Sequence, residues 1–412
     1  MRARIIGVAA LVAAALAVIA ATASGGAAAT NSITVWLQVD AQAANWEPIV
    51  KAANAAFQRE HPGVAVNVQY QTWGNHLQKF DATLAGGNAP DVIEMGNTET
   101  TKYMAAGAFQ DITSDRSSFA NSATWLDGLA AAGRYGGKVY GVPYYAGSRV
   151  VTYRTDLFKK ANIKVPTSLA QFTAAARKLG RQQGDRAFSP VYIAGTDWYF
   201  AMSFVYDNGG AIARQVSGKW KGTLASPKAI AGLTAYRNFF LAASRASKTT
   251  DETKPNPYDV YAQGNAGSMV GPGWFSCCVG DKYKPLTAQF VMPSKTKGLP
   301  MPGFLGGSIL SVPIGANKSL AVDWIKAYTS NQSMTALRSI GNIPNTTSLL
   351  GNSVFERAAR RSWFVPTAKN WVNVENGNIL RNMLAQILTG KLSVRQAAQS
   401  ASDNISSVLN AS

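Results

Sequence analysis

The pattern of apolar and polar positions predicts alternating strands and helices early in the chain. Residues 33–39 alternate apolar and polar side chains as a β-strand does, and residues 46–59 carry apolar side chains at helical spacing. A second strand is predicted at residues 64–70, where apolar side chains alternate with other residues, and a second helix at residues 75–84. The chain therefore opens as β-α-β-α, an order typical of an open α/β sheet.

A third strand begins at residues 91–93 and is followed by polar side chains. Open α/β sheets bind ligands outside the carboxyl ends of their strands. Asn97, Thr98 and Glu99 are therefore candidates for reading the hydroxyl groups of a ligand. The alternative for Thr98 is that it, or Thr100, only caps the following helix.

Residues 137–160 are predicted to lead from one globular half of the protein into another. Pro143 fixes φ and lacks a backbone donor, which suits a strand end or a hinge. Tyr144 and Tyr145 follow it at a bend, and residues 150–153 have the composition of another strand. We expect the two tyrosines to lie where both halves meet.

Later segments repeat the alternation. A Gly/Pro-rich stretch ends near residues 306–308, where we expect the chain to return to the first half. Gly306 and Gly307 are predicted to permit unusual φ values and a close approach to a ligand. Helices are predicted around residues 169–179, 226–244, 320–329, 332–340, 378–388 and 393–409.

Three consecutive segments carry a family resemblance: GVPYY at 141–145, VVTYRTDLFKKANI at 150–163 and VPTSLAQFTAAARKL at 165–179. In this order they resemble the family 1 extracellular solute-binding proteins of ABC importers, the maltose-binding-protein group. The resemblance extends from Ile33 to Val408. It implies a two-lobed α/β fold of the type II periplasmic-binding-protein kind, with discontinuous lobes joined by hinge crossings. It also implies an importer permease as partner, no cofactor and no catalysis.

The N-terminus has the pattern of a signal peptide. Arg2 and Arg4 precede an apolar stretch that ends at Ala21, and A-x-A cleavage sites stand at residues 21–23 and 27–29. The alternative is an uncleaved membrane anchor. Relatives in Gram-positive cells usually carry a lipid-modified cysteine after such a segment, and none stands here. We expect export to the periplasm or to the outer face of the cytoplasmic membrane.

Removing the leader leaves about 380 residues, which is enough for two domains of ordinary size. The predicted division is a signal peptide at 1–29, lobe one at 30–142 and 306–342, and lobe two at 143–305 and 343–412.

Positive charge is in excess but is not clustered. The chain has 40 Lys plus Arg and 22 Asp plus Glu, a net charge of +18. Without Arg2 and Arg4 the balance is 38 − 22 = +16. The cations are scattered singly and form no recognisable nucleic-acid-binding module. We therefore expect a monomer that binds no nucleic acid, with a basic surface that aids solubility or docks on anionic lipid and cell-wall polymers.

Several aromatic residues are candidates for stacking on a sugar ring. Trp46 begins the first helix, and Trp198 follows two polar residues at the point where the resembled family places an aromatic pair against its sugar. Trp274 follows a strand of small residues that cannot shield it, and we expect it to stack on a pyranose ring, the alternative being a core position. Trp371 is equally consistent with stacking and with anchoring the last helices.

Hydrogen bonds to the ligand are expected from Asp40 and Arg149, together with the polar group after the third strand. Arg149 is a charged residue in an otherwise small or apolar run. The alternative for Arg149 is an internal ion pair with a carboxylate of its own lobe.

The only two cysteines, Cys277 and Cys278, are adjacent. Adjacent residues can bridge only through a strained ring, so two free thiols close to the cleft floor are the favoured interpretation. The two histidines, His61 and His76, stand far away in the sequence, and no metal site or cysteine nucleophile is predicted.

These features together predict capture of a neutral di- or oligosaccharide by hinge closure. The alternative ligand is glycerol phosphate or another anionic polyol, which the positive charge favours. A secreted glycosidase would need two carboxylates facing each other across the cleft, and the scarce acidic residues form no such motif.

Overall fold

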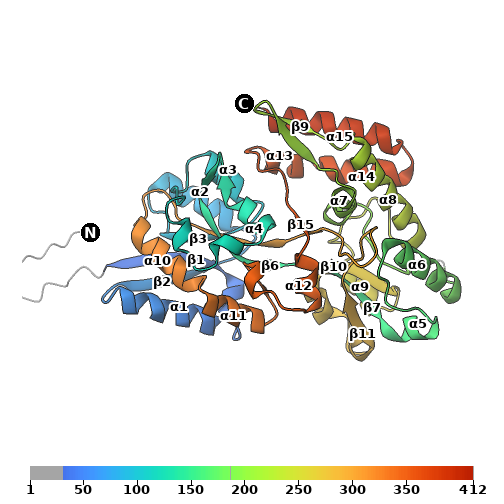
Figure 1. The fold of residues 1–412 in the computed structure, drawn as a ribbon, viewed down its shortest axis with the longest axis horizontal. Coiled ribbons are helices and arrows are strands. Elements are labelled where there is room, and N and C mark those ends of the chain that lie inside the picture. The colour runs from blue at the N-terminus through green and yellow to red at the C-terminus, as the bar shows by residue number, and fades with distance from the viewer. Residues whose placement is uncertain (1–30, 186, 412) are drawn as a thin grey trace, which may run out of the picture.

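The computed structural model describes residues 31–185 and 187–411, so the predicted signal peptide lies outside the described residues. The chain forms two lobes that lie side by side in Figure 1. None of the helices in the described part combines the length and the apolarity that a bilayer crossing requires.

The first lobe, on the left of Figure 1, is built on a six-stranded sheet. Its strands are β1 (Ser32–Gln38), β2 (Ala65–Gln71), β3 (Val92–Gly96), β6 (Gly141–Gly147), β13 (Gly306–Ser311) and β14 (Ile343–Pro344). Their spatial order is β14-β6-β13-β3-β1-β2. β1 is parallel to β2 and β3, whereas β13 is antiparallel to β3 and β6. The predicted opening order of strands and helices is confirmed.

Helices cover both faces of this sheet because strand β1 is apolar on both sides. Ile33, Val35 and Leu37 pack on one face and Trp36 on the other, as successive side chains of a strand must. The first face is covered by α1 (Glu47–Glu60), α10 (Lys318–Tyr328) and α11 (Asn331–Ser339). The second face is covered by α2 (His76–Gly86) and α3 (Thr100–Ala105), and α4 (Asp127–Ala132) lies beside β6.

The second lobe has a smaller sheet and a larger helical core. Its strands β7 (Arg149–Arg154), β10 (Ser268–Pro272) and β11 (Thr287–Phe290) are antiparallel, with β7 in the centre. One continuous apolar cluster joins this sheet to the helices α6 (Leu169–Gln183), α7 (Trp198–Asp207), α8 (Pro227–Ala243), α14 (Ile379–Thr389) and α15 (Val394–Leu409).

Short elements complete the two lobes. The strand pairs are β4 (Arg134–Tyr135) with β5 (Lys138–Val139), β8 (Ala213–Val216) with β9 (Lys219–Gly222), and β12 (Gly303–Phe304) with β15 (Ser362–Trp363). The short helices are α5 (Thr155–Lys160), α9 (Pro257–Ala262), α12 (Val354–Ala359) and α13 (Trp371–Asn376). Six 3-10 turns are also present in the described residues: η1 (Val39–Gln42), η2 (Arg116–Ser118), η3 (Ser122–Thr124), η4 (Gly273–Cys278), η5 (Lys284–Leu286) and η6 (Thr347–Leu349).

Strand pairing indicates where the chain crosses between the lobes. All of β6 belongs to the first sheet, since it pairs with β13 as far as Gly147. β14 also pairs with β6, opposite Tyr145. We therefore propose crossings at Ser148 and after Pro344, slightly later than the boundaries predicted from the sequence at residues 143 and 343.

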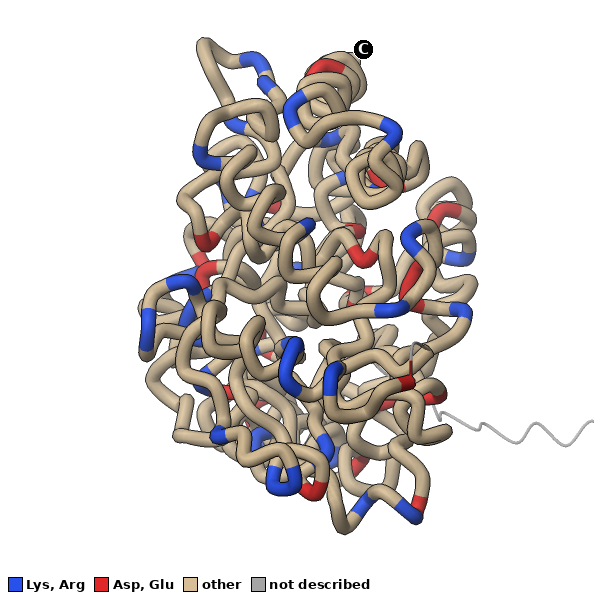
Figure 2. The backbone as a smooth tube through the Cα atoms, turned by 90° about the vertical axis from the view of Figure 1, so that its right-hand side faces the viewer, with Lys and Arg blue, Asp and Glu red and all other residues tan. Residues whose placement is uncertain are grey.

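Basic residues are spread over both lobes. Figure 2 shows Lys and Arg along the outer turns of each lobe, with fewer acidic residues among them. The excess positive charge is therefore distributed over the surface of both lobes and is not confined to one stripe, as the sequence predicts.

Candidate functional site

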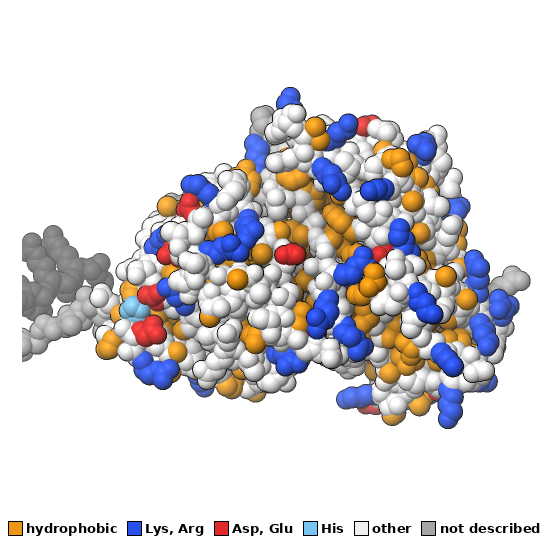
Figure 3. Space-filling view, viewed as in Figure 1, with side chains coloured by type: hydrophobic (Ala, Val, Ile, Leu, Met, Phe, Trp, Pro, Cys, Tyr) orange, Lys and Arg blue, Asp and Glu red, His pale blue; other side chains and the backbone are white. Residues whose placement is uncertain are grey.

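A cavity of about 790 Å³ lies between the two lobes. Figure 3 shows the hollow between them, with hydrophobic side chains exposed along it. The residues that line it are Asp40, Ala43, Trp46, Trp73, Gly96, Glu99, Tyr145, Gly147, Ser148, Arg149, Tyr199, Pro272, Phe304, Gly306, Gly307 and Asn342. The predicted site residues Asp40, Trp46, Glu99, Tyr145, Arg149, Gly306 and Gly307 are thus brought together.

Aromatic rings form much of the wall contributed by the first lobe. Trp46 and Tyr145 meet edge to face, with ring centroids 5.0 Å apart. Trp73, in the turn after β2, is 39% exposed, and its indole N–H donates to Asp40 Oδ2 at 3.0 Å. This hydrogen bond holds the indole beside a carboxylate acceptor, a combination that suits a ring bearing hydroxyl groups.

Tyr144 does not reach the cleft, contrary to the prediction. Successive side chains of a strand point to opposite faces, so Tyr145 faces the cleft while Tyr144 enters the first lobe's core. Its hydroxyl donates to Tyr328 and accepts from the Trp46 indole N–H at 2.8 Å. Tyr144 therefore holds the Trp46 indole in place from the core side, through this hydrogen bond.

Glu99 is held at the cleft surface by fixed donors. Its Oε2 accepts from the Gly96 N–H at 2.8 Å and lies 2.9 Å from His76 Nε2. Burial alone would lower the pKa of His76, but the hydrogen bond and charge of Glu99 raise that pKa above its ordinary value. The imidazolium form of His76 would offset part of the carboxylate charge.

A second carboxyl group, Glu94, lies beneath the cleft floor and is fully buried. It accepts from the Gln38 N–H at 3.0 Å and from the Ser308 hydroxyl at 2.6 Å. Burial raises the pKa of Glu94 to about 7, and these hydrogen bonds only partly oppose the effect. Glu94 links the adjacent strands β1, β3 and β13.

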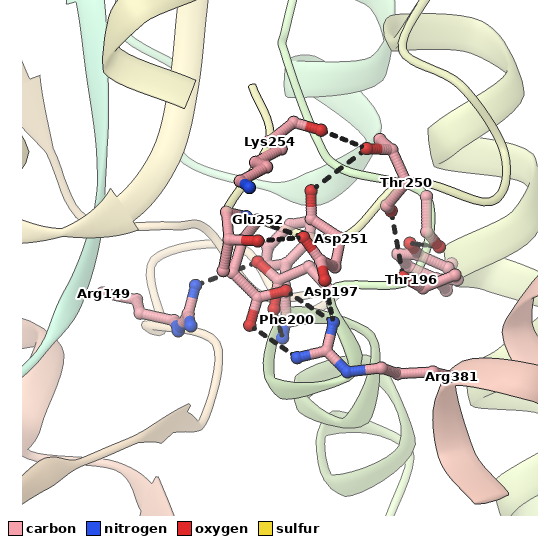
Figure 4. Close-up of polar contacts among 12 residues, drawn as sticks. Arg149, Thr196, Asp197, Phe200, Thr250, Asp251, Glu252, Lys254 and Arg381 are labelled. Atoms are coloured by element: carbon pink, nitrogen blue, oxygen red, sulfur yellow. Dashed lines mark hydrogen bonds and ion pairs between the residues drawn. The ribbon is translucent and has the colours of Figure 1, made fainter. Parts of the chain in front are cut away.

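The second lobe contributes Arg149 and Tyr199. Arg149 Nη1 donates to Asp197 Oδ2 at 2.9 Å, and the guanidinium lies 5.3 Å from the centre of the Tyr199 ring. Burial raises the pKa of Asp197, against the opposing charge of Arg149. Figure 4 shows Arg149 pointing toward Asp197, with Arg381 holding Glu252 behind it through bonds of 3.0 and 3.1 Å. The internal ion pair of Arg149 is therefore present, and Arg149 also lines the cleft, where its hydrogen bond to a ligand stays a prediction.

Trp198 and Trp371 are buried, which contradicts the expectation that Trp198, placed after two polar residues, is exposed for stacking on a sugar. α7 is enclosed on most sides, and Trp198 packs between Trp363 and Trp371. The neighbouring Tyr199 stacks on Trp198 at 3.9 Å and faces the cleft instead. Trp371 donates its indole N–H to Glu375 at 2.6 Å, which supports the anchoring alternative.

Asn97 supports the cleft from within the first lobe and does not line it. Its side-chain amide donates to the Leu305 carbonyl at 2.7 Å, and its N–H donates to the Gly307 carbonyl at 2.9 Å. These bonds tie the β3–α3 turn to the strand that returns from the second lobe. Thr98 is not among the lining residues, and it does not cap α3, since no side chain does so.

Gly306 and Gly307 line the cleft without unusual φ values, since neither has a positive φ. Their roles differ. A Cβ on Gly307 would lie 2.1 Å from the Tyr145 carbonyl oxygen, whereas a Cβ on Gly306 would meet nothing within 4 Å. Gly307 is therefore needed for close strand contact, and Gly306 leaves open space at the cleft.

We expect Gly307→Ala to destabilise the protein by about 1–3 kcal/mol, because the methyl group must displace backbone that pairs β6 with β13. Gly306→Ala is the matched control. Its free energy of unfolding should lie within about 0.5 kcal/mol of that of the parent. Urea unfolding of both variants measures the difference. Equal stability of the two variants would contradict this account.

Trp274 lies in η4, two residues after Pro272 of the cleft wall, and the stacking role of its side chain stays a prediction.

The prediction of two free thiols is wrong, because Cys277 and Cys278 form a disulfide at the exposed end of η4. The tight turn brings their sulfur atoms together. Neither cysteine is among the residues lining the cleft.

Sequence reasoning missed the lining residues Trp73 and Phe304, and of the aromatic pair at residues 198–199 it selected Trp198 where Tyr199 lines the cavity. The rule that identified Glu99, a position just beyond the carboxyl end of a strand, applies equally to Trp73 after β2. No local signal distinguishes Phe304 from a core aromatic residue, and none decides which of Trp198 and Tyr199 faces the cleft. Within residues 31–185 and 187–411, no group of three acidic, histidine or cysteine side chains is arranged to hold a metal ion.

Comparison with known proteins identifies the family. A sequence model described as "Bacterial extracellular solute-binding protein" matches residues 39–335, which is most of the chain. The chain belongs to this family. Diacetylchitobiose binding protein DasA of Streptomyces coelicolor is 29% identical over 386 residues, covering 90% of this chain and 88% of that relative.

Solved structures of solute-binding proteins share the fold. The sugar-binding protein MalE from Xanthomonas citri aligns with a TM-score of 0.78 at 18% identity, covering 92% of this chain and 97% of MalE. UgpB from Mycobacterium tuberculosis, in complex with glycerophosphocholine, aligns with a TM-score of 0.69 at 19% identity. The alignment covers 92% of this chain and 98% of UgpB. The two-lobed α/β architecture predicted from the sequence is confirmed.

Proposed function

We propose that this protein captures a neutral oligosaccharide in the interlobe cavity and delivers it to the permease of an ABC importer outside the cytoplasm. The observation that carries the proposal is the lining itself. Trp46, Trp73 and Tyr145 from the first lobe face a cavity whose other wall holds Tyr199 and Phe304. Aromatic faces stack on the C–H surfaces of sugar rings, and the size of the cavity is ordinary for a ligand site.

Hinge closure explains how such a site binds an uncharged ligand. A ligand that touches both walls only when the lobes are shut shifts the equilibrium toward the closed state. Asp40 and Glu99 would accept hydrogen bonds from hydroxyl groups on one side, and Arg149 would donate from the other. Crossings near Ser148 and after Pro344 would act as the hinge.

Among oligosaccharides, a disaccharide of N-acetylglucosamine is the first candidate. The support is the DasA relative, whose name states that it binds diacetylchitobiose and which aligns along nearly the whole chain. An N-acetyl group presents both an amide donor and a carbonyl acceptor, which fits a site with carboxylate acceptors on one wall and Arg149 on the other.

The anionic polyol is the weaker proposal despite the basic surface. Arg149 is the one cation among the described lining residues, and Asp197 already pairs with it. Asp40 and Glu99 add negative charge to the same cavity. A phosphate group would be repelled by this lining.

We also do not propose a glycosidase, since Asp40 and Glu99 come from the same lobe and each already accepts a hydrogen bond.

Titration calorimetry with a ligand panel tests the proposal. The panel contains diacetylchitobiose, cellobiose, maltose, maltotetraose, glycerol 3-phosphate and glycerophosphocholine. We expect measurable binding of at least one neutral sugar, with diacetylchitobiose tightest, and none of either phosphate. Binding restricted to the phosphate compounds would overturn the sugar assignment.

A further inference from the structure

A second cavity, of about 340 Å³, lies on the second lobe away from the interlobe site, and its lining is mostly apolar. Three segments meet there: residues 165–167, residues 290–300 and residues 352–360. Val165 and Leu299 stand at its rim and are 45% and 47% exposed. Large apolar side chains left this open on a surface indicate contact with something outside the protein.

The two loops that carry these side chains are fixed to each other. The Gly298 N–H donates to the Thr167 carbonyl at 2.8 Å, and the Leu169 N–H donates to the Ser294 carbonyl at 2.9 Å. The exposed apolar rim is therefore a built feature of the fold and needs no loop movement to form.

Exposed cations stand on or directly beside the same three segments. With Val165 and Leu299, they define what we call the basic apolar patch; the cations are Lys164, Lys295, Lys297, Arg357 and Arg360. Figure 3 shows Lys and Arg side chains gathered over α12, which carries Arg357.

These five cations have no carboxylate partner among the described residues. Lys295 bonds to the Asn208 side chain, while Arg357 and Arg360 bond to backbone carbonyls. The one acidic residue in the three segments, Glu356, is buried and paired with Arg338. Asp207 of α7 also contacts this region, since it accepts from the Lys295 N–H at 2.8 Å, but it is buried and pairs with Arg361. The five cations of the patch thus keep their charge without a carboxylate partner among the described residues.

We propose that the basic apolar patch docks the protein on a membrane rich in anionic phospholipid. Val165 and Leu299 enter the headgroup layer while the surrounding cations lie near lipid phosphates. Surfaces that bind anionic bilayers reversibly combine apolar side chains with nearby Lys and Arg. Three of the five cations are lysines, which are depleted at protein–protein interfaces, so a lipid surface fits better than an acidic protein.

Docking of this kind would keep the protein beside a membrane-embedded importer. It does not depend on the identity of the solute, because the patch and the interlobe cavity share no lining residue.

Vesicle co-sedimentation tests the proposal, using the protein without residues 1–29. We expect partition onto vesicles of phosphatidylglycerol mixed with phosphatidylcholine, loss of that partition at high salt, and little binding to phosphatidylcholine alone. The double variant Lys295→Glu/Lys297→Glu should lower partition at least about thirtyfold, because two attractive charges are lost and two repelled charges are added. Leu299→Ser leaves the charge of the protein unchanged and should lower partition onto the vesicles several-fold. Attraction between ions alone does not predict this loss.

The matched control is Lys219→Glu/Lys221→Glu on β9, with the same spacing, exposure and change of charge on the same lobe. It should lower partition less than about threefold, since only charges near the bilayer act strongly. Thermal melts establish that every variant is folded. Absence of wild-type partition, equal losses in both double variants, or an unchanged Leu299→Ser would overturn the proposal. Displacement from the vesicles by free glycerol phosphate would assign the patch to a soluble anion instead.

Discussion

Trp73→Ala is expected to weaken binding of the best sugar at least thirtyfold without unfolding the protein. Trp73 is 39% exposed at the cleft, so its ring has little to do with the core of the first lobe. Losing a central aromatic residue from a binding site typically costs at least ~2 kcal/mol, and each ~1.4 kcal/mol is a factor of ten in affinity. Titration calorimetry with the sugar identified from the panel gives the result directly.

Two further variants separate stacking from hydrogen bonding. Trp73→Phe keeps an aromatic face but loses the indole N–H that donates to Asp40, so its affinity should fall between the parent and Trp73→Ala. Trp220→Ala on β9 removes a tryptophan outside the interlobe cavity and should leave affinity unchanged. Unchanged sugar affinity in a folded Trp73→Ala protein would remove Trp73 from the site.

Stability is expected to fall as the pH rises from about 4.5 to about 7, with Glu94 as a principal cause. Burial raises the pKa of Glu94 from 4.5 to about 7 in the folded protein. The folded state therefore holds this proton more tightly than the unfolded state does. The stabilisation is fully present below pH 4.5 and is lost as the pH passes through the folded pKa, a difference of about 3 kcal/mol.

Glu94→Gln isolates that contribution, because an uncharged amide resembles the protonated acid at every pH. Urea unfolding across this range should give a free energy that depends less on pH in the variant, with the two proteins most alike near pH 4.5. Burial also raises the pKa of Glu375 to about 7. Glu375 is present in both proteins, so its contribution to the pH dependence of stability cancels in the comparison. Parallel pH profiles for parent and variant would contradict the assignment to Glu94.

Local sequence was sufficient to predict the longer helices and the opening strands. The predicted first helix, residues 46–59, is α1 at Glu47–Glu60, and the predicted last helix is α15 at Val394–Leu409. Ser226 caps α8 by accepting from the Ala229 N–H, with Pro227 in the first turn, as the sequence pattern indicates. These outcomes depend on side-chain periodicity and capping, which act over a few residues and are therefore visible in a single sequence.

The sequence by itself also predicted that polar groups beyond strand ends lie at the cleft, and Glu99 and Asp40 do line it. Only the tertiary structure decided which member of each aromatic pair faces the cavity. Tyr145 and Tyr199 line the cavity because Tyr144 is held by Tyr328, and Trp198 by tryptophans from the C-terminal part of the chain. Those partners are distant in sequence, and both members of each pair are aromatic, so periodicity alone could not separate a cleft ring from a core ring.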